Sequence, residues 1–307
     1  MNPSHLTLVA GATGLLGGEI VRQLRGRDAA VRALVRTPAT DATMQAQGVE
    51  VAQGDLKDPA SLARACAGVK CVVSTCTAIR SRREGDSLAS VDDEGHRNLI
   101  DAARRAGATH FVFVSFPPNG LDYPLQRAKR AVESHLRASS LTWTILHPVN
   151  FMEVWLSPAL GFDPLAGRAR VFGDGTRPVS WVSFRDVARF AVAATFDEHL
   201  AGRTLPLGGP DALAPSRVIQ IFEELGAPKV NVDYVPEAAL EEQLRSATDP
   251  LAQSYAASML STARGQLVEM TATLQLVQGS LRTVRSYATE LLRASQGRMK
   301  QGVKHSA

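Results

Sequence analysis

The chain has 307 residues, 45% of them hydrophobic and 21% charged, which is the composition of a globular protein long enough for one large or two modest domains. Its formal net charge of +4 is too small for this length to indicate nucleic-acid binding. Three cysteines without framework spacing argue against a disulfide scaffold, and no Cys/His cluster has metal-ligand spacing. With neither a signal-type stretch nor an apolar run long enough to span a membrane, we expect a cytoplasmic protein without nucleic acid, metal or a membrane span.

Short apolar runs alternate with amphipathic helical patterns from the N-terminus to about residue 148. The runs are residues 6–10, 31–35, 49–52, 71–74, 111–115 and 143–147. The helical patterns are residues 14–25, 92–106 and 125–138. This alternation predicts βαβ units, and strands that are apolar throughout indicate that helices cover both faces of a parallel sheet. We therefore expect an α/β fold in which residues 1–148 form a Rossmann-type, doubly wound parallel sheet.

The alternation becomes irregular after His147. Residues 149–248 mix Gly- and Pro-rich stretches with short strands and helices, and we expect them to form a smaller, mixed substrate lobe interleaved with the core. Residues 249–294 are expected to form a helical C-terminal extension. Apolar residues from Leu267 to Leu291 recur at steps of three and four, which predicts a helix packed on the body, on a second subunit or on a partner protein, with a membrane-surface helix as the alternative. Residues 295–307 are polar and are expected to be disordered.

A glycine-rich loop follows the first strand and opens the first helix. Its glycines, Gly11, Gly14 and Gly17, have the spacing G-x-x-G-x-x-G. Glycine permits a sharp turn, a close approach of backbone to a pyrophosphate and tight packing of helix on strand, while the positive end of the helix attracts the phosphates. The loop therefore predicts dinucleotide binding by Gly11, Thr13, Gly14, Leu15, Leu16 and Gly17.

The residues after the next strands refine the choice of cofactor. Arg36 follows the second strand, where NAD-dependent enzymes place an acid for the ribose hydroxyls, and a cation there favours a 2′-phosphate. We expect NADP(H), with NAD(H) possible and a solvated surface charge as the alternative role of Arg36. Asp55 and Leu56 follow the third strand, where Asp55 could accept from the adenine amino group or cap the next helix. Ser74 and Thr75 close the fourth strand at the same edge.

These motifs, in this order, resemble the atypical short-chain dehydrogenase/reductase family, in its NmrA-like branch. The resemblance covers about residues 5–235 and is carried by segments 11–17, 34–36, 54–56, 98–103, 111–115, 129–133, 143–148, 185–188 and 207–210. It implies a Rossmann core, a small C-terminal lobe and a site between them. It also implies that Ser115 lies beside the nicotinamide, that Lys129 contacts the nicotinamide ribose, and that Pro148, Asn150 and Phe151 lie along the nicotinamide.

One departure from the family pattern concerns the proton donor. Short-chain reductases pair a tyrosine with a lysine four residues later, and the lysine lowers the pKa of the phenol. Here Leu125 stands four residues before Lys129, and Tyr123 precedes Pro124, which places it before the helix. Tyr123 as a displaced acid and His147 are therefore secondary candidates for the proton donor, whereas His96 and His110 are expected at the surface or at helix ends.

Together these features predict an NADPH-dependent oxidoreductase that transfers hydride to a small conjugated, aromatic or quinone-like acceptor, planar and apolar. Lys129 would fix the ribose and Ser115 would polarise the substrate. Two alternatives stay open. One is a non-catalytic NADP(H) sensor of the NmrA type, and the other is an assembly role in which bound nucleotide holds the fold together. A homodimer or a partner protein could use the helical tail.

Overall fold

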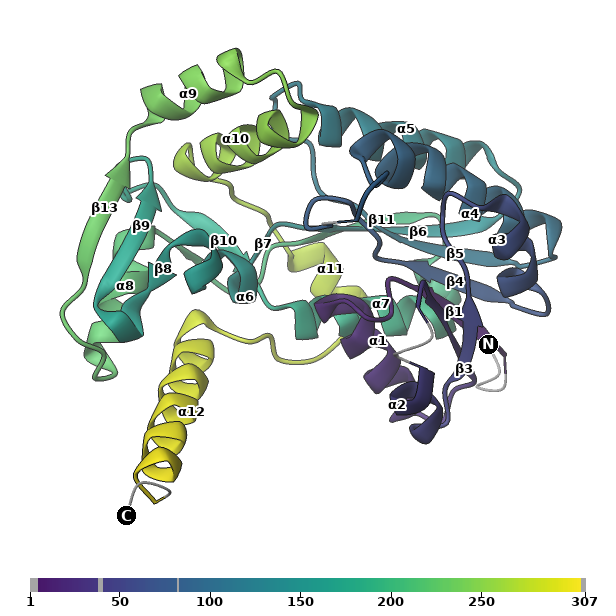
Figure 1. The fold of residues 1–307 in the computed structure, drawn as a ribbon, viewed down its shortest axis with the longest axis horizontal. Helices are drawn as coiled ribbons and strands as arrows, with labels where there is room; N and C mark the ends of the chain where they lie inside the picture. Colours follow the sequence, from purple (N-terminus) through teal and green to yellow (C-terminus); the bar gives the residue numbers. More distant parts are fainter. Residues whose placement is uncertain (1–4, 38–40, 82, 305–307) are drawn as a thin grey trace.

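The computed structural model describes residues 5–37, 41–81 and 83–304, which form a Rossmann-type core and a smaller lobe beside it (Figure 1). The core is a seven-stranded parallel sheet with the order β11-β6-β5-β4-β1-β2-β3. Its strands are β1 (Thr7–Ala10), β2 (Val31–Val35), β3 (Glu50–Gln53), β4 (Cys71–Ser74), β5 (His110–Val114), β6 (Thr142–Pro148) and β11 (Arg203–Leu207). The order reverses between β1 and β4, and ligands bind at such a point, beyond the carboxyl ends of the strands.

Helices cover both faces of the sheet. One face carries α1 (Leu15–Arg25), α2 (Asp41–Ala46) and α7 (Phe184–Phe196). The other carries α3 (Pro59–Cys66), α4 (Glu94–Arg105), which the π-helix η2 (Leu88–Asp93) precedes, and α5 (Pro124–Ala138). Alternate strand residues fill the two cores, since Val9 packs with the first set of helices and Leu8 with the second. The predicted doubly wound α/β fold is confirmed.

The smaller lobe is built from the segment after β6. It contains two three-stranded sheets, β12-β10-β7 and β13-β9-β8. Its elements are β7 (Asn150–Phe151), α6 (Met152–Trp155), η3 (Pro158–Leu160), β8 (Phe162–Asp163), η4 (Pro164–Ala166), β9 (Arg168–Phe172), β10 (Val179–Val182), β12 (Ala212–Leu213), α8 (Pro215–Glu224) and β13 (Asn231–Val235). The chain returns to the core between these elements, because α7, the turn η5 (Glu198–Leu200) and β11 complete the Rossmann sheet.

Four helices follow the smaller lobe: α9 (Glu237–Ser246), α10 (Pro250–Ala263), α11 (Thr271–Leu276) and α12 (Val284–Lys304). α10 packs against α5, and the backbone N–H of Leu125 donates to Ser254 Oγ. No helix in the described part of the chain combines the length and apolarity needed to cross a membrane.

The prediction of one continuous apolar helix from Leu267 to Leu291 is wrong. The chain leaves its helical path after α11, and Gly279 has a φ of 132°, which a helix does not allow. As a result, Met270 packs on the Rossmann core, whereas Tyr287 packs in the smaller lobe. α12 continues to Lys304, through residues 295–304 that were expected to be disordered. Residues 305–307 lie outside the described part.

Candidate functional site

Gly11 and Gly17 are required by the fold of the loop itself. Gly11 has a left-handed backbone with a φ of 83°, and a Cβ on it would lie 2.5 Å from Thr75 Oγ1. A Cβ on Gly17 would lie 2.1 Å from the carbonyl oxygen of Gly11. The Thr75 hydroxyl donates to the carbonyl of Ala10 over 3.2 Å, which ties the end of β4 to the start of the loop.

Gly14 has a different environment. Its backbone is extended, and the nearest heavy atom to a Cβ there would be the Gly11 carbonyl oxygen at 3.3 Å. Thr13, Gly14 and Leu15 are exposed, and Gly14 is the N-cap of α1, which no side chain in the described part of the protein caps. The first N–H groups of α1 are therefore open to an anion at the positive end of the helix. A bare loop and an uncapped helix N-terminus fit a pyrophosphate group, with Leu16 and Gly17 in the first turn.

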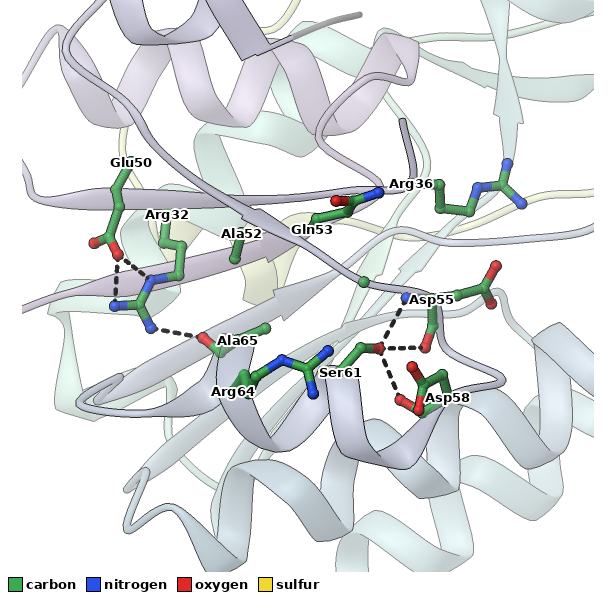
Figure 2. A pocket seen from close by; sticks show the side chains of 11 residues that line it. Arg32, Arg36, Glu50, Ala52, Gln53, Asp55, Asp58, Ser61, Arg64 and Ala65 are labelled. Carbon is green, nitrogen blue, oxygen red and sulfur yellow. Dashed lines mark hydrogen bonds and ion pairs between the residues drawn. The ribbon is translucent and has the colours of Figure 1, made fainter. Parts of the chain in front are cut away.

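The ends of β2 and β3 lie beside a cavity of about 580 Å³ (Figure 2). Figure 2 shows Arg32 turned toward Glu50 and the Ala65 carbonyl, whereas Arg36 lies at the other end, on the side of Asp55. Arg36 Nη1 lies 2.6 Å from Asp86 Oδ2, so the cation expected at the 2′-phosphate already has an acidic neighbour.

Asp55 and Leu56 are placed as the sequence suggested, at the carboxyl end of β3. Asp55 Oδ1 accepts from the backbone N–H of Lys57 over 2.9 Å, which stabilises a tight turn. Helix α3 is capped instead by Asp58, which accepts from the N–H of Ala60. Leu56 is buried, and its carbonyl accepts from the Asn98 side chain.

Lys129 lies on α5 in a buried ion pair. Its Nζ is 3.3 Å from Asp92 Oδ1 and 5.0 Å from the centre of the ring of Phe113, the penultimate residue of β5. The other carboxylate oxygen, Asp92 Oδ2, accepts from the backbone N–H of Ala78 beyond β4. Asp92 thus joins Lys129 to the segment that follows Ser74, at the edge of the sheet where the glycine loop also lies. Ser74 itself is fully buried.

Ser115 belongs to a polar network at the ends of β5 and β6. Its hydroxyl accepts from Arg130 over 2.8 Å, and Arg130 also pairs with Glu133. His147 Nε2 lies 2.9 Å from Glu133 Oε1. Burial alone would raise the pKa of Glu133, but hydrogen bonds from His147 and Ser115 and the charge of Arg130 lower it. The structure therefore brings Ser115 and His147 together around one charged carboxylate.

Tyr123 is the N-cap of α5, ahead of Pro124, as the sequence predicted. The side chain is buried and stacked on Phe116, with ring centres 6.2 Å apart, and its oxygen accepts from Asn119 over 3.1 Å. Burial raises the pKa of Tyr123 to about 12. A phenol with such a pKa is a poor proton donor near neutral pH.

The segment after β6 connects the core to the smaller lobe. Pro148 ends β6, Asn150 and Phe151 form β7, and Asn150 Oδ1 accepts from Thr262 of α10 over 3.3 Å. The amide nitrogen of Asn150 is buried and has no hydrogen-bond partner among the residues that the structure describes. A second cavity of about 240 Å³ lies between the β5–α5 loop and the chain after α10, with Leu121 on one side and Leu267 on the other.

Sequence reasoning missed the acidic members of these networks, Asp86, Asp92 and Glu133. Asp86 and Asp92 gave no signal in the sequence, because their partners lie on other elements. Glu133 follows Arg130 at a spacing that allows an ion pair on one helix, but its contact with His147 depends on the fold. His96 lies in the first turn of α4, at a helix end as expected, but it is buried. The expectation for His110 is wrong, since it is buried at the start of β5. His96 Nδ1 donates to the carbonyl of Val91, and its ring meets Phe113 edge-on.

Comparison with known proteins gives both sequence relatives and structural neighbours. Residues 11–198 match a family model described as NAD(P)H-binding. The photosystem II assembly factor Ycf39 of Synechocystis sp. is 32% identical over 257 residues, covering 82% of this chain and 76% of the relative. An NAD(P)H azoreductase of Xenophilus azovorans is 31% identical over 215 residues, covering 69% and 71%. An NADPH-dependent quinone oxidoreductase of Escherichia coli shares the fold, with a TM-score of 0.75, 24% identity and coverage of 93% and 99%.

Proposed function

Because the chain belongs to the NAD(P)H-binding family, we propose that it is an NADPH-dependent reductase acting on a small, planar, conjugated or quinone-like acceptor. Bound NADPH would supply the hydride from its nicotinamide ring, while the protein supplies orientation and electrostatics. The observation that carries the proposal is a lysine retained without its tyrosine: Lys129 is buried against Asp92, and Leu125 occupies the position four residues earlier.

The missing tyrosine limits the range of acceptors. Reduction of an ordinary ketone needs an acid that protonates the new alkoxide, and the usual tyrosine is absent. Tyr123 does not replace it, because it is buried in a stack with Phe116 and its pKa is raised to about 12. A quinone-like or azo acceptor delocalises the charge it gains and needs less help from an acid. The azoreductase and the quinone oxidoreductase among the similar proteins support this choice.

Roles for the remaining site residues follow from their positions. Lys129 would hold the nicotinamide ribose, and Pro148, Asn150 and Phe151 would lie along the ring. Ser115, held by Arg130, would polarise the acceptor. His147 or water would supply the proton, and Glu133, 2.9 Å from Nε2, would orient the His147 ring.

A preference for NADPH over NADH rests on positive charge at the adenosine end. Arg36 follows β2 directly, and Lys57 lies in the loop between β3 and α3. Opposite charges a few ångströms apart attract strongly near a protein surface, and a 2′-phosphate offers the negative partner. Asp55 would accept from the adenine amino group. We also propose that the protein acts in the cytoplasm.

The test is an assay of NADPH oxidation with purified protein and a panel of quinones and azo compounds, with a saturated ketone as the control acceptor. We expect oxidation with conjugated acceptors and none with the ketone. Tight NADPH binding without oxidation by any acceptor would contradict the proposed reaction.

A second candidate is a nucleotide-binding protein that acts through a partner without turnover. The similarity to the Ycf39 assembly factor favours it, because that relative is named for assembly and not for a reaction. In this case NADPH would raise the melting temperature, as any ligand of the folded state does, while no acceptor would be reduced.

A further inference from the structure

Asp86 is an almost completely buried carboxylate held between two cations. Its side chain is 2% exposed, with Oδ2 2.6 Å from Arg36 Nη1 and Oδ1 2.6 Å from Lys57 Nζ. The hydroxyl of Ser81 donates to Oδ2 over 2.5 Å. Burial alone would raise the pKa of Asp86, but hydrogen bonds from Lys57, Ser81 and Arg36 lower it to about 2. The carboxylate is therefore charged at any physiological pH.

We propose that Asp86 is an internal counter-ion that occupies the 2′-phosphate position and gives up Arg36 and Lys57 when NADPH binds. The inference rests on the proposed function, which assigns Arg36 to the adenosine end of the cofactor. The geometry supports the exchange, since the guanidinium, the ammonium and the hydroxyl that donate to the Asp86 carboxylate are the kinds of donor from which a phosphate monoester also accepts.

The places of the two cations in the fold also support an assignment to the 2′-phosphate position. Arg36 comes from the end of β2 and Lys57 from the β3–α3 loop, and these segments flank the adenosine ribose in a Rossmann site. Asp86 comes from the chain between β4 and η2. Its neighbours Glu84, Gly85 and Ser87 are exposed, so a carboxylate released from the two cations reaches water. The exchange therefore does not leave a buried charge without a partner.

The exchange makes Asp86 a determinant of cofactor specificity. NADH carries a hydroxyl where NADPH carries the phosphate, so NADH binds without breaking the contacts of Asp86. NADPH must break them, and its affinity is lower than the two cations alone would give. Removing the negative charge of Asp86 should therefore raise the affinity for NADPH and leave the affinity for NADH unchanged.

The experiment compares 2′,5′-ADP with 5′-ADP, two fragments that differ by the 2′-phosphate, by calorimetric titration of the full chain. For Asp86→Asn we expect the Kd of 2′,5′-ADP to fall about five- to tenfold, which corresponds to the net contribution of one hydrogen bond, and the Kd of 5′-ADP to change by less than about twofold. Asp93→Asn is the matched control. It removes the same charge from the same region, but Asp93 pairs with Arg97 and contacts neither Arg36 nor Lys57.

A structural role for Asp86 would give the opposite result. If Asp86→Asn and Asp86→Ala both weaken the binding of the two fragments alike, or leave the ratio of the two Kd values unchanged, the inference is wrong. A gain in affinity cannot come from misfolding, and it should vanish in an Arg36→Ala/Lys57→Ala background if it acts through these cations.

The outcomes also separate this inference from the proposed function. Wild-type protein that binds both fragments equally would contradict the NADPH preference, and the Asp86 inference would survive only if Asp86→Asn created a preference. Wild-type protein that prefers 2′,5′-ADP, together with an Asp86→Asn variant showing the same preference, would contradict the Asp86 inference alone.

Discussion

Gly14 and Gly17 lie three residues apart in one loop, and substituting each by alanine should have different effects. In Gly17→Ala, the new Cβ would lie 2.1 Å from the carbonyl oxygen and 2.6 Å from the carbonyl carbon of Gly11. Both atoms belong to the backbone of the loop, so the loop itself must move. We expect a loss of about 2–4 kcal/mol in the free energy of unfolding, even after the gain of roughly 0.5–1 kcal/mol that alanine brings to a helix.

In Gly14→Ala, the fold should be nearly unaffected. The backbone there has a φ of −82° and a ψ of 169°, which any residue adopts, and the nearest contact of the new Cβ is 3.3 Å. We expect a loss of less than about 1 kcal/mol, because only a shift of a few tenths of an ångström is needed. The Cβ would, however, project from the exposed end of α1 toward the pyrophosphate, and NADPH affinity should fall by about 100-fold or more.

The assay is urea unfolding of wild type and both variants, together with NADPH binding followed by fluorescence. We predict that Gly14→Ala is stable but binds NADPH about 100-fold more weakly than wild type, and that Gly17→Ala is destabilised. This prediction would be refuted if Gly14→Ala bound NADPH within about twofold of wild type, or if Gly17→Ala were as stable as wild type.

Charge, proton donation and acid stability at the site can each be tested with one substitution. Arg36→Asp should lower the NADPH-to-NADH ratio of kcat/KM by about 100-fold, and an unchanged ratio would exclude a role at the 2′-phosphate. Tyr123→Phe should change kcat by less than about twofold, whereas a loss of 100-fold would make Tyr123 the proton donor. Burial and the nearby charge of Lys129 lower the pKa of His96 from 6.5 to about 3, so the unfolded chain takes up this proton first as the pH falls. The contribution of a neutral His96 to stability is complete above pH 6.5 and declines toward pH 3, and His96→Gln should flatten this decline in urea titrations at different pH values.

Features with a local physical cause could be predicted from the sequence. The alternation of apolar runs and amphipathic helices gave the sheet, and the glycine loop gave the NAD(P)H cofactor and the family, which the family match confirms. The position of Tyr123 before Pro124 also followed from a local rule, since proline is favoured in the first turn of a helix.

Features that depend on contacts between distant segments could not be predicted. Asp86 meets Arg36 across 50 positions, and Asp92 meets Lys129 across 37, so their roles appear only when the chain is folded. The stripe from Leu267 to Leu291 kept its helical spacing across the break at Gly279, because periodicity records which residues are apolar and not where the chain bends. The signal at Gly279 was present, since glycine commonly ends helices.

The central claim is that hydride leaves bound NADPH for a conjugated acceptor. The most direct measurement is the rate of quinone reduction with NADPH that carries deuterium at the nicotinamide C4, compared with unlabelled NADPH. Our account predicts acceptor-dependent oxidation of both cofactors and a slower reaction with the deuterated one when the chemical step limits single turnover. Saturable NADPH binding with no loss of hydride or deuteride to any acceptor would contradict it.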